Sequence, residues 1–160
     1  MSAPYTNDTG KIPPDATLRR LESGDITALI ALERECFATA WQEDQFLLAI
    51  QQKAFCVFGL FLRHVDLVGY ISVYHLAGEL EILNIAVSQE QRRQGFGLHL
   101  LAKAMRLGHK RGMTRAVLEV RAGNAAAIAM YERMGFSLAG KRPGYYEDTG
   151  EDALIYAALL

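Results

Sequence analysis

The sequence predicts a single α+β domain built on a mixed sheet, and two observations support this prediction. Between residues 54 and 88, three stretches rich in β-branched and aromatic residues follow one another with short turns between them, which is typical of an antiparallel meander. After the meander, helical apolar patterns alternate with further strand patterns up to the end of the 160-residue chain. We find no internal repeat in the sequence.

The first part of the chain supplies one strand and two helices. Residues 1–15 are polar, contain Pro and Gly and lack periodicity, so we expect a flexible tail followed by the domain at 16–160. Asp25 is expected to cap the first helix, whose apolar stripe has Glu33 at its inner edge. Trp41 is expected to act as a packing anchor between the helices. The expected elements are a strand at 16–23, a helix at 26–37 and a helix at 42–52.

The meander and the elements after it complete the domain. The three strands of the meander are expected at 54–63, 66–76 and 78–88, with the tetrapeptide RHVD as the first turn. The patterns then predict a helix from Gly95 to about Gly112, a strand at 115–120, a helix at 124–136, a short strand near 137–141 and a final strand at 151–160.

The composition argues against several classes of function. The net charge is −1 with both signs interspersed, so we expect no nucleic-acid surface. No apolar run approaches the roughly 20 residues of a membrane span. The start lacks the order of a signal peptide, so a cytoplasmic location without membrane contact is expected. Cys36 and Cys56 are interpreted as core residues, and the four histidines lack metal-ligand spacing, so no metal is expected.

The stretch QEQRRQGFGLHLL, residues 89–101, indicates a phosphate site. Here the chain leaves a strand and starts a helix, whose first N–H groups have no partner within the helix. Gly95 and Gly97 would let a phosphate approach the backbone, and Arg92 and Arg93 add positive charge. A plain turn with solvated arginines is the alternative. A P-loop is excluded because GxxxxGK[ST] is missing, and a dinucleotide fold is disfavoured because the third glycine of GxGxxG is replaced by leucine.

Together with its flanks, LNIAVSQEQRRQGFGLHLL resembles the acyl-CoA signature of the GCN5-related N-acetyltransferase (GNAT) superfamily. Its R-x-x-G-x-G core matches Arg92, Gly95 and Gly97. The resemblance implies a mostly antiparallel sheet with helices on both faces, splayed between the fourth and fifth strands beside a bulge. It also implies acetyl-CoA as cosubstrate, with pantetheine on the backbone of Ile85, Ala86 and Val87. The amides expected to cradle the diphosphate are those of Arg93, Gln94, Gly95, Phe96, Gly97 and Leu98.

A second stretch, LEVRAGNAAAIAMYERMGF, resembles the RimI-type branch of this superfamily, which acetylates the N-terminal alanine of a small-subunit ribosomal protein. LNIAV and YYEDTGEDALIYA match the same branch. Asn124 is expected to cap the helix that it begins, and the resemblance adds a contact with pantetheine. One departure concerns Trp41, which this branch often flanks with Pro and Ser, whereas Ala40 and Gln42 stand here. The departure concerns how the first two helices line the peptide site.

Acetyl transfer from a thioester to an amine needs a base for the amine and an acid for the departing thiolate. Glu119, near the end of a strand, is the expected base by resemblance; a solvated glutamate paired with Arg115 or Arg121 is the alternative. Tyr131, on a helix rich in small residues, is the expected acid, and a core aromatic is the alternative. A backbone amide near Val87 is the expected donor to the oxyanion.

The peptide-binding residues are expected on three segments. Tyr145 and Tyr146 are interpreted as a loop that covers the peptide, or else as tyrosines that pack the loop. Glu79 and Glu81 are candidates for attracting a cationic N-terminus, unless strand alternation leaves them solvated. Trp41 completes the set.

The sequence therefore predicts a monomeric acetyl-CoA-dependent N-terminal acetyltransferase that transfers the acetyl group directly in a ternary complex with a ribosomal-protein N-terminus. The alternatives are a GNAT-fold acetyltransferase for lysine or small amines and a non-catalytic acyl-CoA-binding module.

Overall fold

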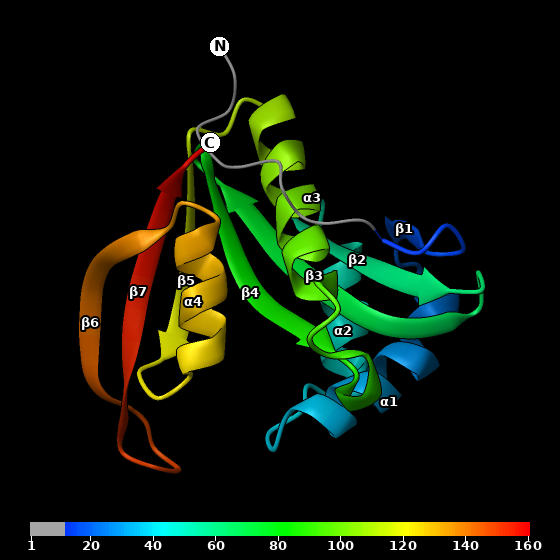
Figure 1. Cartoon of the computed structure of the whole chain (residues 1–160), viewed down its shortest axis with the longest axis horizontal. Coiled ribbons are helices and arrows are strands. Elements are labelled where there is room, and N and C mark those ends of the chain that lie inside the picture. The colour runs from blue at the N-terminus through cyan, green and yellow to red at the C-terminus, as the bar shows by residue number, and fades with distance from the viewer. Residues whose placement is uncertain (1–11) are drawn as a thin grey trace.

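The computed structural model describes residues 12–160, which form a seven-stranded mixed sheet with helices on both faces (Figure 1). The expectation of a flexible tail over residues 1–15 falls mostly outside the described residues. In chain order the elements are β1 Thr17–Arg20, α1 Ile26–Cys36, α2 Glu43–Gln51, β2 Phe55–Leu62, β3 Asp66–Leu76, β4 Glu79–Val87, α3 Phe96–Lys110, β5 Arg115–Arg121, α4 Ala125–Arg133, β6 Ser137–Tyr146 and β7 Glu151–Leu159.

The predicted α+β class, the order of elements and the antiparallel meander are confirmed. The strands lie in the order β1-β2-β3-β4-β5-β7-β6, and only the β4–β5 pair is parallel. This pair is short, because Glu79–Ile82 alone align with Arg115–Leu118. Beyond Ile82 the two strands diverge, which confirms the predicted splay between the fourth and fifth strands.

A bulge interrupts β4 where the divergence begins. Ser72 of β3 pairs with Asn84, whereas the next residue, Val73, pairs with Ile82, so Leu83 has no partner on β3. An extra residue of this kind bends the strand and increases its twist. The bulge therefore directs the rest of β4 away from β5.

Two clusters of buried residues hold the helices to the sheet. On one face, α3 and α4 pack on β3, β4 and β5, while α1 and α2 pack on the other face over β2 and β3 (Figure 1). Leu100, Leu101 and Met105 of α3 are fully buried, and each contributes about 1.5–3 kcal/mol by leaving water. The face covered by α3 and α4 carries the larger cluster.

Two local expectations need correction. Asp25 is the N-cap residue of α1 as expected, but its carboxylate makes no capping hydrogen bond to that helix. The carboxylate instead pairs with Arg19 at 2.7 Å and accepts the Glu22 N–H at 2.9 Å. The physical reason is a short 3-10 turn at Ser23–Asp25, which Asp25 closes. The expected short strand near 137–141 is instead the ten-residue β6, so Tyr145 and Tyr146 end a strand rather than lie in a loop.

Candidate active site

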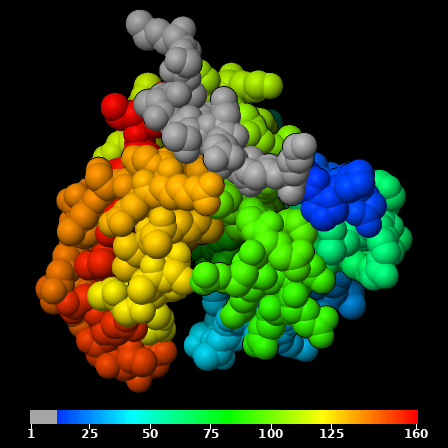
Figure 2. Space-filling view, in the orientation of Figure 1, coloured from blue at the N-terminus to red at the C-terminus, as the bar shows by residue number. Residues whose placement is uncertain are grey.

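The splay leaves one edge of β4 without a strand partner on the β5 side. Ser88 N–H donates to the Val68 carbonyl at 2.8 Å, so the backbone groups of Ser88 face β3. In an antiparallel pair, the N–H and C=O groups of successive residues point alternately toward the partner strand and away from it. The backbone groups of Ile85 and Val87 therefore point into the gap, while those of Ala86 point to β3. Of the three residues expected to hold pantetheine, two present their backbone to the gap. Figure 2 shows the surface hollowed between α4 and the region of β4 and α3.

The start of α3 presents a run of open donors. No backbone N–H from Arg93 through Leu98 has a hydrogen-bond acceptor within residues 12–160. Gly95 is the N-cap with φ of +84°, a left-handed conformation that glycine adopts without strain, and Arg93 is also left-handed at +66°. Successive N–H groups in such a turn converge on an anion. The arrangement fits a diphosphate.

The arginines and Gln94 surround this turn in different ways. Arg92 donates its Nε–H to the Val87 carbonyl at 3.1 Å, so it ties the turn to the end of β4. Arg93 is exposed, and Gln94 donates to the Gln91 side chain at 3.1 Å. Arg92 is thus partly structural, whereas the Arg93 side chain remains accessible to a ligand.

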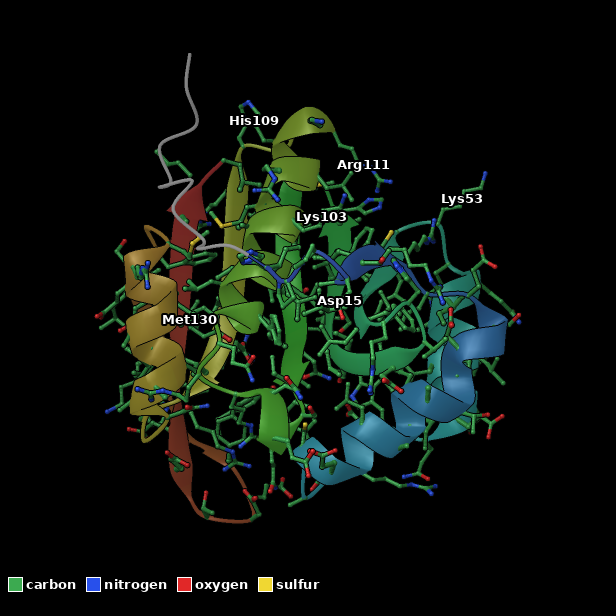
Figure 3. The ribbon with its side chains drawn as sticks, turned by 45° about the vertical axis from the view of Figure 1, so that its right-hand side comes forward. Asp15, Lys53, Lys103, His109, Arg111 and Met130 are labelled. Atoms are coloured by element: carbon green, nitrogen blue, oxygen red, sulfur yellow. The ribbon has the colours of Figure 1, made fainter. Side chains whose placement is uncertain are left out.

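Gly97 has a packing role that the sequence did not suggest. A Cβ at this position would lie 3.0 Å from the Met130 sulfur, which extends from α4 toward α3 (Figure 3). Glycine therefore lets the start of α3 approach α4 across the gap. On α4 itself, Asn124 caps the helix as expected, its Oδ1 accepting the Ala127 N–H at 3.2 Å.

Glu119 and Tyr131 lie on opposite faces of the sheet at the splay. On β5, Ala116, Leu118 and Val120 point into the core under α3 and α4, so by alternation Glu119 points to the other face. The carboxylate is half-buried, and its Oε1 forms an ion pair with Arg142, whose Nε lies 3.1 Å away. The partner is thus neither of the two arginines considered from sequence: Arg115 pairs with Glu79, and Arg121 pairs with the β6–β7 turn.

Tyr131 belongs to the core face, where its ring lies 5.9 Å from that of Phe136. Burial, with a smaller contribution from Tyr146, raises the pKa of Tyr131 to about 12. The phenol therefore keeps its proton over the whole neutral range and can act as a donor. No hydrogen bond engages its hydroxyl within residues 12–160.

Tyr146 lies near both candidate catalytic groups. Burial raises the pKa of Tyr146, the Arg121 guanidinium opposes this, and the charge of Glu119 adds to it. Tyr146 thus lies within electrostatic range of both Glu119 and Tyr131. Its ring is held by the Arg121 guanidinium 3.8 Å from the ring centroid, and Tyr145 packs edge-on at 5.2 Å. Tyr145 is 46% exposed, so it remains available to a ligand.

The side chains of the other expected peptide-binding residues make contacts of their own, outside this group. Trp41 packs at 5.0 Å from Phe46 and 6.1 Å from Phe55, as a packing anchor would. Glu79 and Glu81 are exposed on the part of β4 that still pairs with β5, and Glu79 bonds Arg115 at 3.0 Å. The structure does not bring these glutamates to the open end of the splay.

Sequence reasoning missed two residues of interest. Arg142 reaches Glu119 from β6, two strands away in the sheet, and no local pattern predicts that contact. Glu33 is 1% exposed, and its position in the apolar stripe of α1 was a signal that could have found it. Within residues 12–160, no group of His, Cys, Asp and Glu could hold a metal, and no helix is long and apolar enough to cross a membrane.

The sheet opens beside a bulged strand, with open amides on one face of the gap and a carboxylate on the other, so two ligands could meet there from opposite faces. The chain belongs to the acetyltransferase (GNAT) family, whose model matches residues 26–136.

Named relatives share nearly the whole length of the chain. The Escherichia coli K12 [ribosomal protein bS18]-alanine N-acetyltransferase is 36% identical over 143 residues, covering 88% of this chain and 95% of that protein. The crystal structure of the E. coli ribosomal-protein-S18-alanine N-acetyltransferase superposes with a TM-score of 0.83, covering 90% of this chain and 93% of that one. Ard1 from Thermoplasma volcanium gives a TM-score of 0.81 at 25% identity, covering 91% and 98%.

Proposed function

We propose that this chain acetylates the N-terminal alanine of a small-subunit ribosomal protein, with acetyl-CoA as the donor. The observation that carries this proposal is the 36% identity with the E. coli bS18-alanine N-acetyltransferase over 88% of this chain and 95% of that protein. Such a substrate belongs to the cytoplasm, and no part of the scheme needs a metal or a nucleic acid.

The donor side of the gap fits acetyl-CoA. The open amides of Arg93 through Leu98 suit a diphosphate. The edge of β4 at Ile85 and the Val87 N–H suits the amides of pantetheine, which pair with it as an added strand would, whereas the Val87 carbonyl already accepts from Arg92. Asn124 stands at the start of α4 on the same side. When bound there, acetyl-CoA supplies an activated acetyl group as a thioester.

The residues around the gap then divide the proton transfers. Glu119 removes a proton from the acceptor ammonium, directly or through a water, so that the amine can attack; Arg142 holds one carboxylate oxygen and leaves the other for this task. The amine nitrogen attacks the thioester carbon, the C–N bond forms, and the C–S bond breaks with its electron pair on sulfur. Tyr131 donates its proton to the departing sulfur, and the second proton of the attacking nitrogen passes to solvent, from which Tyr131 is reprotonated. The Val87 N–H, turned toward the gap, is placed to stabilise negative charge on the carbonyl oxygen.

The acceptor side is the face that carries Glu119. Tyr145 and Tyr146 border this face from β6, and their aromatic rings offer a surface for a peptide backbone. Because no step needs an acetyl-enzyme, Cys36 and Cys56 have no part in the scheme.

A comparison of acceptors tests the proposal. The enzyme is incubated with acetyl-CoA and, separately, a peptide that begins with alanine, the same peptide with a blocked N-terminus and an internal lysine, and a polyamine. Free thiol is followed with time, and the products are identified by mass spectrometry. We expect thiol release only with the free N-terminal alanine. Acetylation of lysine or polyamine alone would indicate a different acetyltransferase, and acetyl-CoA binding without thiol release for any amine would indicate a binding module.

A further inference from the structure

The fold buries a carboxylate that the catalytic scheme does not use. Glu33 lies on the inner side of α1 beside Leu29 and Ile30, and it is 1% exposed. Burial raises the pKa of Glu33, and two donors oppose this effect. The Tyr70 hydroxyl donates to Oε2, and the Trp41 backbone N–H donates to Oε1 at 3.1 Å. A buried carboxyl with both oxygens engaged is held in one orientation.

The two donors come from different parts of the molecule. Tyr70 is on β3, directly opposite Ala86 of β4, and the Asn84 side chain at the bulge lies within range of its hydroxyl. Trp41 is the last residue but one of the connection between α1 and α2, residues 37–42, which is neither helix nor strand. Glu33 therefore joins this irregular connection to the strands that shape the gap.

The connection lies on the acceptor side of the sheet. Helices α1 and α2 cover the face opposite α3 and α4 (Figure 1). By strand alternation, Glu119 points to that same face. The end of α1 also reaches the open end of β4, because Cys36 Sγ lies 3.5 Å from the Val87 carbonyl and Glu35 accepts the Gln89 N–H at 2.6 Å. The C-terminal end of α1, from which the connection starts, therefore adjoins the open end of β4.

We propose that Glu33 is a positioning residue for the acceptor: it holds the Trp41 backbone, and with it the connection 37–42, at a fixed place beside the gap. The inference rests on the proposed N-terminal acetyltransferase function. An irregular segment of six residues has few backbone partners of its own, so a buried acceptor that fixes one of its N–H groups restricts its conformations before the peptide arrives. Loss of this contact would weaken acceptor binding more than donor binding.

Three substitutions test the proposal kinetically. Leucine in E33L fills a similar volume but offers no acceptor to Trp41. Glutamine in E33Q keeps a carbonyl oxygen for the Trp41 N–H, and its amide can donate to Tyr70. Alanine in L29A is the matched control, because it loosens the same face of α1 by a cavity and leaves the Glu33 contacts in place. We expect the peptide KM to rise about tenfold in E33L and to stay within about threefold of wild type in E33Q and L29A, with the acetyl-CoA KM nearly constant throughout.

Trp41 is the single tryptophan of the chain, so its fluorescence reports on the connection without any catalysis. We expect acrylamide to quench Trp41 more strongly in E33L than in wild type, E33Q or L29A, because the released connection exposes the indole. This readout separates the two claims. If wild type acetylates no N-terminus, the proposed function fails, and the quenching comparison still decides whether Glu33 holds Trp41.

An E33L enzyme with wild-type peptide KM overturns the proposal, and so does an equal rise of KM in L29A. Should E33L fail to fold, E33D serves instead, since its carboxylate is one methylene too short to hold both donors. An unchanged peptide KM in E33D overturns the proposal in the same way.

Discussion

Replacing Tyr131 with phenylalanine removes the proposed proton donor and leaves a ring that fills the same core position. The hydroxyl donates to the leaving sulfur in the scheme above, and general acid catalysis of this kind contributes about 10²–10⁴-fold. We expect kcat of Y131F to fall by about 100-fold or more, while the Kd for acetyl-CoA changes by less than about threefold, because the donor is held elsewhere by backbone groups.

Y131F should also change how the free energy of unfolding depends on pH. The pKa of Tyr131 rises from an ordinary value of 10.0 to about 12 in the folded protein, mainly through burial. Between these two values the unfolded chain loses the proton while the folded one keeps it, so stability falls as pH rises. At about 1.4 kcal/mol per pH unit, this group accounts for a loss of about 3 kcal/mol between pH 10 and pH 12. Y131F should lack that part of the alkaline loss.

The assay measures thiol release with an alanine-starting peptide between pH 6 and pH 9.5, and urea unfolding between pH 9 and pH 12. Y156F is the matched control, because Tyr156 is also a buried tyrosine of the core and donates to Glu132 at 3.0 Å, away from the proposed chemistry. We expect Y156F to keep kcat within about threefold of wild type. A Y131F enzyme with more than half of the wild-type kcat would refute the acid assignment, and an unchanged alkaline stability difference would refute the burial argument.

Three further predictions follow from the site and the core. G95A places a side chain at φ of +84°, which costs about 1–2 kcal/mol, so it should weaken acetyl-CoA binding measured by calorimetry. The control G112A, at φ of +78° near the far end of α3, should leave acetyl-CoA binding unchanged. Equal losses of affinity in the two variants would contradict the amide site. R142M should lower kcat about tenfold with unchanged acetyl-CoA affinity, and R142K should recover part of the lost kcat. A wild-type steady-state rate in R142M would exclude a role for the ion pair with Glu119. L101A should lower the free energy of unfolding in urea by about 2–5 kcal/mol, since Leu101 is fully buried, and a smaller loss would show that the core under α3 collapses into the space.

Periodicity in the sequence was enough to predict the order of elements, because the meander and the amphipathic helices each have their own local signal. The splay was expected only from the family resemblance, since no local pattern reports where two strands diverge. β6 was underestimated for a physical reason. It is mostly exposed and contains Gly140, Pro143 and Gly144, so it lacks the apolar alternation of a buried strand. Its length follows from pairing with β7, which a local pattern does not report.

The candidate site also contains features that local sequence could predict and features that only the fold determines. The open amides near Gly95 could be anticipated, because a helix start leaves its donors free wherever it lies. The contact between Glu119 and Arg142 could not, since it depends on β7 lying between β5 and β6 in the sheet. Glu33 is the intermediate case. A glutamate in an apolar stripe predicts burial, but its partners Tyr70 and Trp41 are known only from the fold.

A crystal structure of the protein with acetyl-CoA tests the central claim most directly. The account predicts the diphosphate on the amides of Arg93 through Leu98, the pantetheine along the free edge of β4, and the sulfur between Glu119 and Tyr131. A ligand bound outside the β4–β5 gap, or a sulfur from which both side chains point away, would contradict it.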